Sequence, residues 1–181
     1  MKKWACVVLT AIAVAGLSSA QEKKPTLAPV PPGVPNVELT VYLVSGLAQP
    51  QAGGKDEVPP DLAETLQQLR GVFAYKSYRL IEAITLLGRN GRGVEAAGQL
   101  PDFSHYDFKY ARARISPEAP QLVHFDGLRF EITHRHSGRI DTVALVSTDL
   151  DVRDGQKTVV GKSAVNATDA VFLVIVPKVV E

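Results

Sequence analysis

The sequence is poor in sulfur and indole: it has one cysteine, one methionine and one tryptophan among 181 residues. All three lie in the first six positions, as Met1, Trp4 and Cys6. If that end is removed, the rest of the chain can form no disulfide, supply no thiolate or methionine ligand, and build no zinc site with cysteine ligands. Packing alone must then hold the fold together.

The first 20 residues have the three-part pattern of a secretory signal peptide. Lys2 and Lys3 are followed by an uncharged apolar run at residues 5–17 and by small residues at 18–20. We therefore predict cleavage after about Ala20 and a periplasmic or secreted mature protein. A retained N-terminal anchor is the alternative, but the run is shorter than the roughly 20 residues of a spanning helix, so we expect no transmembrane helix after cleavage.

The mature chain is close to neutral. Removal of residues 1–20 leaves 161 residues, with 18 basic and 19 acidic side chains. A net charge near zero gives no long-range attraction to nucleic acid, so we predict no nucleic-acid partner. The length suits one domain with a core large enough to be stable without disulfides.

Residues 21–36 are rich in proline, which permits neither a helix nor a sheet ladder; the five prolines are Pro25, Pro29, Pro31, Pro32 and Pro35. We interpret this segment as an extended, polyproline-like linker, with a docking ligand as the alternative. A single domain is then expected over residues 37–181.

The domain begins with a strand and a helix. Residues 37–46 alternate in polarity and predict a strand. After a turn-rich stretch, Asp61 is a candidate helix N-cap with Glu64 three positions later. The residues spaced along one face of this predicted helix are Leu62, Leu66, Leu69 and Phe73.

The rest of the domain is predicted to be strands joined by tight turns. Asn90-Gly91 predicts a hairpin, because both central residues of a type I′ turn need positive φ. Asp126-Gly127, Ser137-Gly138 and Asp154-Gly155 predict further turns, and residues 171–176, apolar on both faces, predict a strand in the middle of a sheet. We therefore expect an α+β domain: an antiparallel-rich sheet of about seven to eight strands with one covering helix near the N-terminal side.

One predicted strand carries an aromatic and basic face. If residues 106–114 form a single strand, one face presents Tyr106, Phe108, Tyr110, Arg112 and Arg114. Aromatic rings and guanidinium groups stack on sugars and other planar ligands. This face is our candidate for binding a small ligand or a polysaccharide, and half of a hydrophobic core is the alternative.

The histidines do not amount to a metal site. His134 and His136 share a strand face, and His124 precedes the Asp126-Gly127 turn, so three imidazoles are available if they converge. We interpret residues 133–138 instead as a polar hairpin end, and we predict no metal.

Catalytic patterns are also missing. No serine lies in a Gly-x-Ser-x-Gly turn, and Gly161-Lys162-Ser163 lacks the earlier glycine of a phosphate-binding loop. Asp149 and Asp151 could form a carboxylate pair on one strand face, but a solvated strand is the simpler interpretation. We therefore predict a protein that is not an enzyme and needs no cofactor.

The C-terminal part of the chain carries two motifs. Residues 148–161 contain Asp154-Gly155-Gln156 and a Val-Val-Gly return to Gly161, and residues 172–180 are an apolar strand ending in Pro177-Lys178-Val179-Val180. These segments resemble the end of the secretin domain, the ring-forming outer-membrane channel family of bacterial secretion and pilus systems. Residues 37–44 also look like the strand that begins such a domain.

The resemblance implies a hairpin at Asp154-Gly155 and a small, non-enzymatic envelope protein. Such a protein would act as an assembly component that binds a protein partner in the cell envelope. Self-association into an oligomer is compatible with it.

Overall fold

The computed structural model describes residues 35–49, 59–102, 104–118, 120–136 and 138–180, and of His136 it describes only the backbone. The predicted signal peptide and nearly all of the predicted linker lie outside these residues. Most of the turn-rich stretch before the helix also lies outside them.

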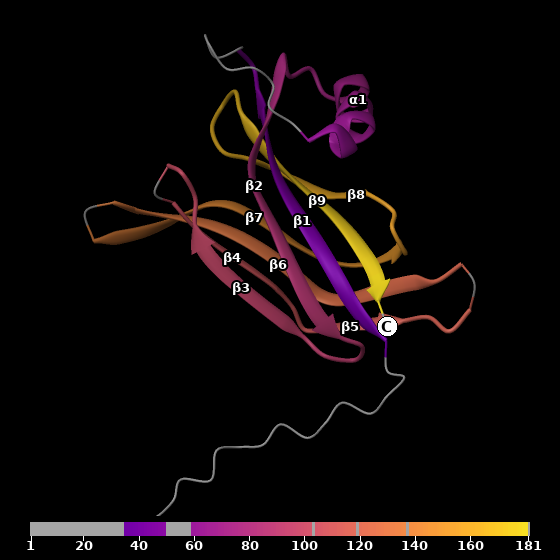
Figure 1. The fold of residues 1–181 in the computed structure, drawn as a ribbon. Helices are drawn as coiled ribbons and strands as arrows, with labels where there is room; N and C mark the ends of the chain where they lie inside the picture. The colour runs from indigo at the N-terminus through magenta and orange to yellow at the C-terminus, as the bar shows by residue number, and fades with distance from the viewer. Residues whose placement is uncertain (1–34, 50–58, 103, 119, 137, 181) are drawn as a thin grey trace, which may run out of the picture. The chain divides into compact units, whose positions relative to one another are not determined.

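The described residues form antiparallel strands and one short α-helix (Figure 1). The elements are β1 (Asn36–Leu47), the 3₁₀ turn η1 (Pro60–Leu62), α1 (Ala63–Val72), β2 (Ser77–Arg89), β3 (Val94–Gln99), β4 (His105–Tyr110), β5 (Arg112–Ile115), β6 (Leu122–His136), β7 (Arg139–Arg153), β8 (Thr158–Ala164) and β9 (Ala170–Val180). The antiparallel character and the single helix were predicted. Nine strands replace the expected seven to eight, in part because residues 106–114 are divided between β4 and β5.

The strands form two sheets instead of the single sheet that we predicted. The first sheet has the order β2-β1-β9-β8. In the second sheet, β6 pairs with β7 along one edge and with β4 and β5 along the other, and β3 lies outside β4.

The Asn90-Gly91 turn leads from β2 in the first sheet to β3 in the second, and the Asp154-Gly155 turn leads from β7 back to β8. Neither turn closes a hairpin, so both hairpin predictions are wrong. Gly91 and Gly155 do have positive φ values of 81° and 71°. The dipeptides therefore predict the turns correctly, but a turn does not determine which strands pair.

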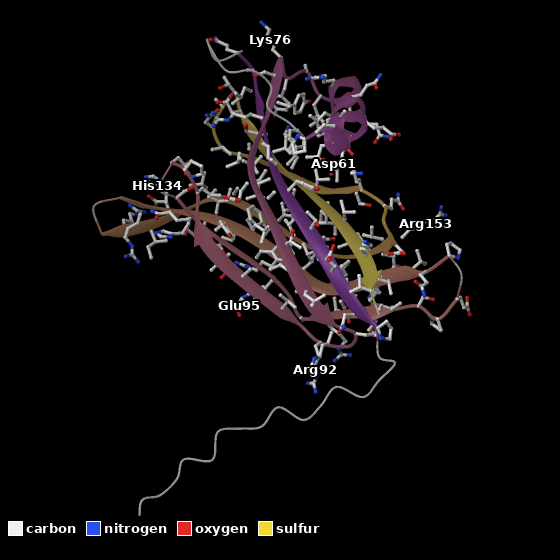
Figure 2. The ribbon with its side chains drawn as sticks, in the orientation of Figure 1. Asp61, Lys76, Arg92, Glu95, His134 and Arg153 are labelled. Atoms are coloured by element: carbon white, nitrogen blue, oxygen red, sulfur yellow. The ribbon has the colours of Figure 1, made fainter. Side chains whose placement is uncertain are left out.

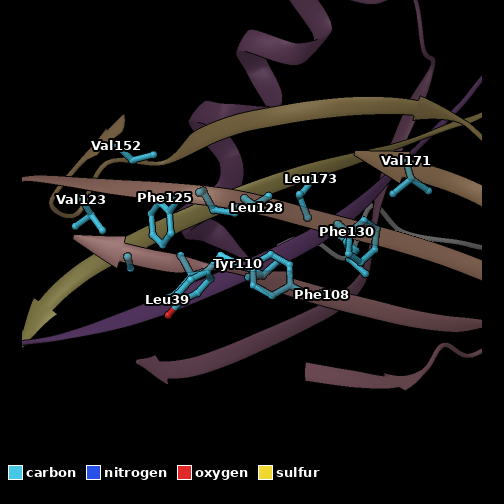
Figure 3. Packing of buried hydrophobic residues seen from close by; sticks show 14 of the residues in the cluster. Leu39, Phe108, Tyr110, Val123, Phe125, Leu128, Phe130, Val152, Val171 and Leu173 are labelled. Carbon is cyan, nitrogen blue, oxygen red and sulfur yellow. The ribbon is translucent and has the colours of Figure 1, made fainter. Parts of the chain in front are cut away.

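The two sheets pack face to face around the main core. Figure 3 shows side chains of both sheets in this layer. Its fully buried members include Leu39 and Leu173 from the first sheet and Phe108, Tyr110, Phe125 and Phe130 from the second. Burial of interdigitating apolar side chains from two sheets is the main stabilising contribution in such an arrangement.

Helix α1 covers part of the other face of the first sheet. Leu62, Leu66 and Leu69 pack there in a second cluster with Phe172 and Tyr78. Strand β9 lies between β1 and β8 and is buried on both faces, which confirms the prediction of a central strand. Among the described residues, no helix has the length and apolarity needed to cross a membrane.

The helix start differs from the prediction in one detail. The N-cap is Leu62, which follows η1, and no side chain caps the helix. Asp61 instead accepts a hydrogen bond from the Tyr42 hydroxyl at 2.8 Å, which ties the start of the helix to β1. The predicted Asp61 cap is therefore wrong, because a 3₁₀ turn places this residue one position too early.

A turn predicted at Asp126-Gly127 is a bulge inside β6. The register shifts between Phe125 and Leu128, and Gly127 has a φ of 60°, which few residues other than glycine adopt. Strand β6 therefore runs uninterrupted for 15 residues. The Ala111 N–H donates to the Asp126 carbonyl at this point, where β4 gives way to β5.

Candidate functional site

The predicted aromatic and basic face does not exist as one face. Phe108 and Tyr110 are 0% and 2% exposed, within the core between the sheets, and Tyr106 packs against that core. Arg112 and Arg114 are exposed.

The reason is the break at Ala111. Tyr110, before the break, and Ala113, three positions later, both point into the core, so the alternation of inward and outward side chains shifts by one residue. The bulge in the paired strand β6 shifts its alternation in the same way. Alternation along the sequence cannot be carried across such a break. The ligand-binding face that we predicted is therefore wrong.

The secretin-like residues form one connected structural unit. The Asp154 carboxylate accepts a hydrogen bond from the Val179 N–H at 2.8 Å, and the Gly155 N–H donates to the Pro177 carbonyl at 2.7 Å. The Gln156 N–H closes the turn on the Arg153 carbonyl at 3.0 Å. The turn between the sheets is thus fastened to the end of β9.

Pro177 and Gly161 fit this unit sterically. Pairing of β9 with β8 ends at Ile175, so the missing N–H of Pro177 costs no bond to β8. At Gly161 an added Cβ would lie 2.8 Å from a methyl carbon of Val146 in the second sheet, so the strands approach closely there. These contacts give the residues structural roles, and the resemblance to secretins stays a prediction.

A cavity of about 580 Å³ lies where one end of the first sheet meets one end of the second. Its inner wall is apolar and comes from β2, β6, β7, β9 and the connection after β3; the wall includes Leu80, Ile81, Leu100, Ile132, Val143 and Val171. The volume lies within the range of about 300–1,000 Å³ that is typical of small-molecule sites.

Two bulges, one in each sheet, help to form this cavity. Ile81 is the extra residue of a bulge in β2, since Leu43 pairs with Glu82 and the next residue, Val44, pairs with Leu80. Val143 is the extra residue of a bulge in β7. Both line the cavity. Bulges bend a strand and redirect a side chain, and here they do so on opposite walls. Sequence reasoning missed both residues, because they lie in ordinary apolar runs.

Polar side chains gather at the same cavity: Arg79, Asp102, His134, Asn166 and Asp169. They come from β2, β6 and two loops, one between β3 and β4 and one between β8 and β9. A largely apolar cavity with a few convergent polar groups is the usual form of a small-molecule binding site.

A second polar cluster lies on the solvent-facing side of the second sheet. The two ring nitrogens of His124 lie 2.6 Å from Asp151 and 2.7 Å from Asp126. Arg114 pairs with Asp126 at 3.1 Å. The hydrogen bonds to Asp151 and Asp126 raise the pKa of His124 above its ordinary value. Because both ring nitrogens are occupied, the histidine is placed to join β6 to β7 and not to accept a proton from a substrate, while Arg114 links β5 to the same cluster through Asp126.

The candidate carboxylate pair is divided between two partners. Asp151 binds His124, whereas the Asp149 carboxylate accepts a hydrogen bond from the Gly127 N–H at the bulge. These contacts account for both carboxylates structurally.

Of the three candidate histidines, His124 and His134 do not converge, and the side chain of His136 lies outside the described residues. His124 and His134 are ten residues apart along β6, or roughly 33 Å. Figure 2 shows His134 at one end of the β6–β7 pair and Arg153 toward the other end. Arg153 pairs with Leu122, the first residue of β6, and therefore marks the end of the pair at which His124 lies. Within the described part of the chain, no three histidine or acidic side chains are grouped to hold a metal ion.

Comparisons with known proteins place the chain in no family. No protein-family model matches it, and neither a curated protein nor a solved structure gives a significant match.

Proposed function

We propose that this protein is an exported, non-enzymatic binding protein that takes up a small, largely apolar ligand in the cavity between its two sheets. The observation that carries the proposal is the cavity of about 580 Å³, with Ile81 and Val143 bulging into it from opposite sheets. Export is supported by the signal-peptide pattern of residues 1–20.

The apolar wall favours binding over catalysis. A ligand body placed against Leu100, Ile132 and Val171 would gain about 25 cal/mol for each Å² of apolar surface removed from water. The Ser45 hydroxyl near the wall donates to the Arg79 carbonyl, which is no base for its proton. The Ser104 hydroxyl donates to Asp102, and the lowered pKa of that carboxyl makes it a weak general base.

The test is binding of the neutral fluorophore N-phenyl-1-naphthylamine, followed by its emission. We expect saturable binding by the purified protein. Val143→Trp places an indole in the cavity and should weaken binding at least about tenfold, which corresponds to 1.4 kcal/mol. Because the only natural tryptophan is Trp4, the introduced indole also reports proximity of the fluorophore by energy transfer.

Leu145→Trp is the matched control. Leu145 lies two positions away on the same strand, is 45% exposed and does not line the cavity. It should leave the affinity unchanged. Absence of saturable binding to the unmodified protein, or equal affinity of the two tryptophan variants, contradicts the proposed function.

A protein partner is the second candidate, and the outer edge of β2 favours it. This strand has 13 residues and pairs only with β1 among the described strands, and Leu87 on it is 67% exposed. Such an edge accepts an extended segment of another chain by strand addition. Leu87→Lys should then abolish crosslinking to an envelope protein in cells. If the unmodified protein forms no such crosslink and sediments only as a monomer, this candidate is wrong.

A further inference from the structure

The charges around the cavity indicate which ligands it prefers. Two carboxylates reach it from different loops, Asp102 after β3 and Asp169 before β9. The Ser104 hydroxyl donates to Asp102 at 2.5 Å and lowers the pKa of that carboxyl. The Asn166 amide donates to Asp169 at 2.9 Å and, with the Ala48 N–H, lowers the pKa of Asp169. Both groups are therefore anionic at neutral pH.

The carboxylate of Asp102 has an oxygen available to a ligand. Ser104 donates both its N–H and its hydroxyl to Oδ1, and no described residue donates a hydrogen bond to Oδ2. Of the side chains lining the cavity, Arg79 and His134 are basic, and Arg79 is already engaged in an interaction of its own.

We infer that the ligand is an amphipathic cation, with an apolar body against the inner wall and an ammonium group beside Asp102. This inference rests on the proposed function, since it names the ligand class of the same cavity. An ammonium group would form a charge-assisted hydrogen bond with the carboxylate. A carboxylate head would instead meet the like charges of Asp102 and Asp169.

Three probes with the same eight-carbon chain test the inference: octylamine, octanol and octanoate, each measured by displacement of N-phenyl-1-naphthylamine at pH 7 and low salt. We expect octylamine to bind at least about tenfold more tightly than octanoate, with octanol between them. Octanoate binding as tightly as octylamine, or more tightly, overturns the inference.

Asp102→Asn separates charge from shape. The amide keeps an oxygen that can accept from Ser104, so the loop should hold its form, while the affinity for octylamine should fall about fivefold or more and that for octanol should not change. Asp107→Asn on β4, which does not line the cavity, is the control and should change neither affinity.

The outcomes distinguish this inference from the proposed function. Failure of the fluorophore and all three probes to bind contradicts the binding function itself. Two results contradict only the inference that the ligand is a cation: equal affinity for all three probes, or an Asp102→Asn variant that still prefers octylamine as strongly as the unmodified protein does. If Asp102→Asn lowers the melting temperature, Asp169→Asn supplies the same charge test from the other loop.

Discussion

The two sheets differ in how their faces are covered. In β9 of the first sheet, the neighbouring residues Phe172 and Leu173 are 0% and 1% exposed, although they point to opposite faces. In β6 of the second sheet, Phe125 is fully buried, whereas its neighbour His124 points outward into an ionic cluster. The first sheet is therefore held by packing on both faces, and the second combines packing on one face with ion pairs on the other.

The largest effect is expected on the second buried face of the first sheet, which helix α1 covers and which has no counterpart in the second sheet among the described residues. Phe172 contacts the rings of Phe73, Tyr75 and Tyr78 at centroid distances of 5.1–5.8 Å. Phe172→Ala should lower the free energy of unfolding by about 3–5 kcal/mol, through lost burial and the cavity left behind. Leu87→Ala, on the same sheet but 67% exposed, should change it by less than about 0.5 kcal/mol.

Chemical denaturation of the two variants decides the point. A loss below about 1 kcal/mol for Phe172→Ala would mean that the layer beneath the helix does not behave as a core, and the contrast between the sheets would disappear.

The second-largest change in unfolding free energy is expected at Gly88, where the first sheet lies close to the second. A Cβ added to Gly88 on β2 would collide with the hydroxyl oxygen of Tyr110 on β4. That hydroxyl is buried and has no hydrogen-bond partner among the described residues, and burial raises the pKa of Tyr110 to about 12. Gly88→Ala should cost about 1–3 kcal/mol by overpacking.

Tyr110→Phe removes the oxygen that blocks the added methyl group, so Gly88→Ala should cost less in that background. We expect a coupling of at least about 0.5 kcal/mol in the double-mutant cycle. If the costs of Gly88→Ala and Tyr110→Phe are additive, the close approach of the two sheets is contradicted.

Gly71→Ala is the control for adding a methyl group to a glycine. It lies in the helix, where an added Cβ meets nothing within 4 Å, and should stabilise the protein by about 0.5–1 kcal/mol.

The parts of the first sheet that depend on local sequence patterns could be predicted from the sequence. Residues 171–176 are apolar without alternation, and that pattern correctly predicted a central strand buried on both faces. The helix face of Leu62, Leu66 and Leu69 was likewise predicted, because helical spacing is local information.

The predictions failed where pairing or register depends on distant residues. Asn90-Gly91 and Asp154-Gly155 form their turns, but whether the next strand joins the same sheet depends on the whole core. The break at Ala111 is fixed by a hydrogen bond to Asp126, 15 positions along the chain, so alternation alone misplaced the side chains after it. The cavity needs bulges in two different sheets, and no local pattern predicts these.

The smallest effect belongs to the exposed face of the second sheet. Because Asp151 and Asp126 raise the pKa of His124 in the folded protein, the protonated ring stabilises the fold. This contribution is complete below the ordinary pKa of 6.5 and is lost as the pH rises through the raised value. The cluster is substantially exposed, so the change should be no more than about 1 kcal/mol.

The difference in unfolding free energy between the unmodified protein and His124→Asn isolates this contribution, because other titrating groups cancel. That difference should shrink as the pH is raised from below 6.5 to above the raised pKa, and 1 M salt should reduce it further. A difference that grows with pH would mean that His124 is bound in its neutral form, and the ionic part of the contrast between the sheets would then be wrong.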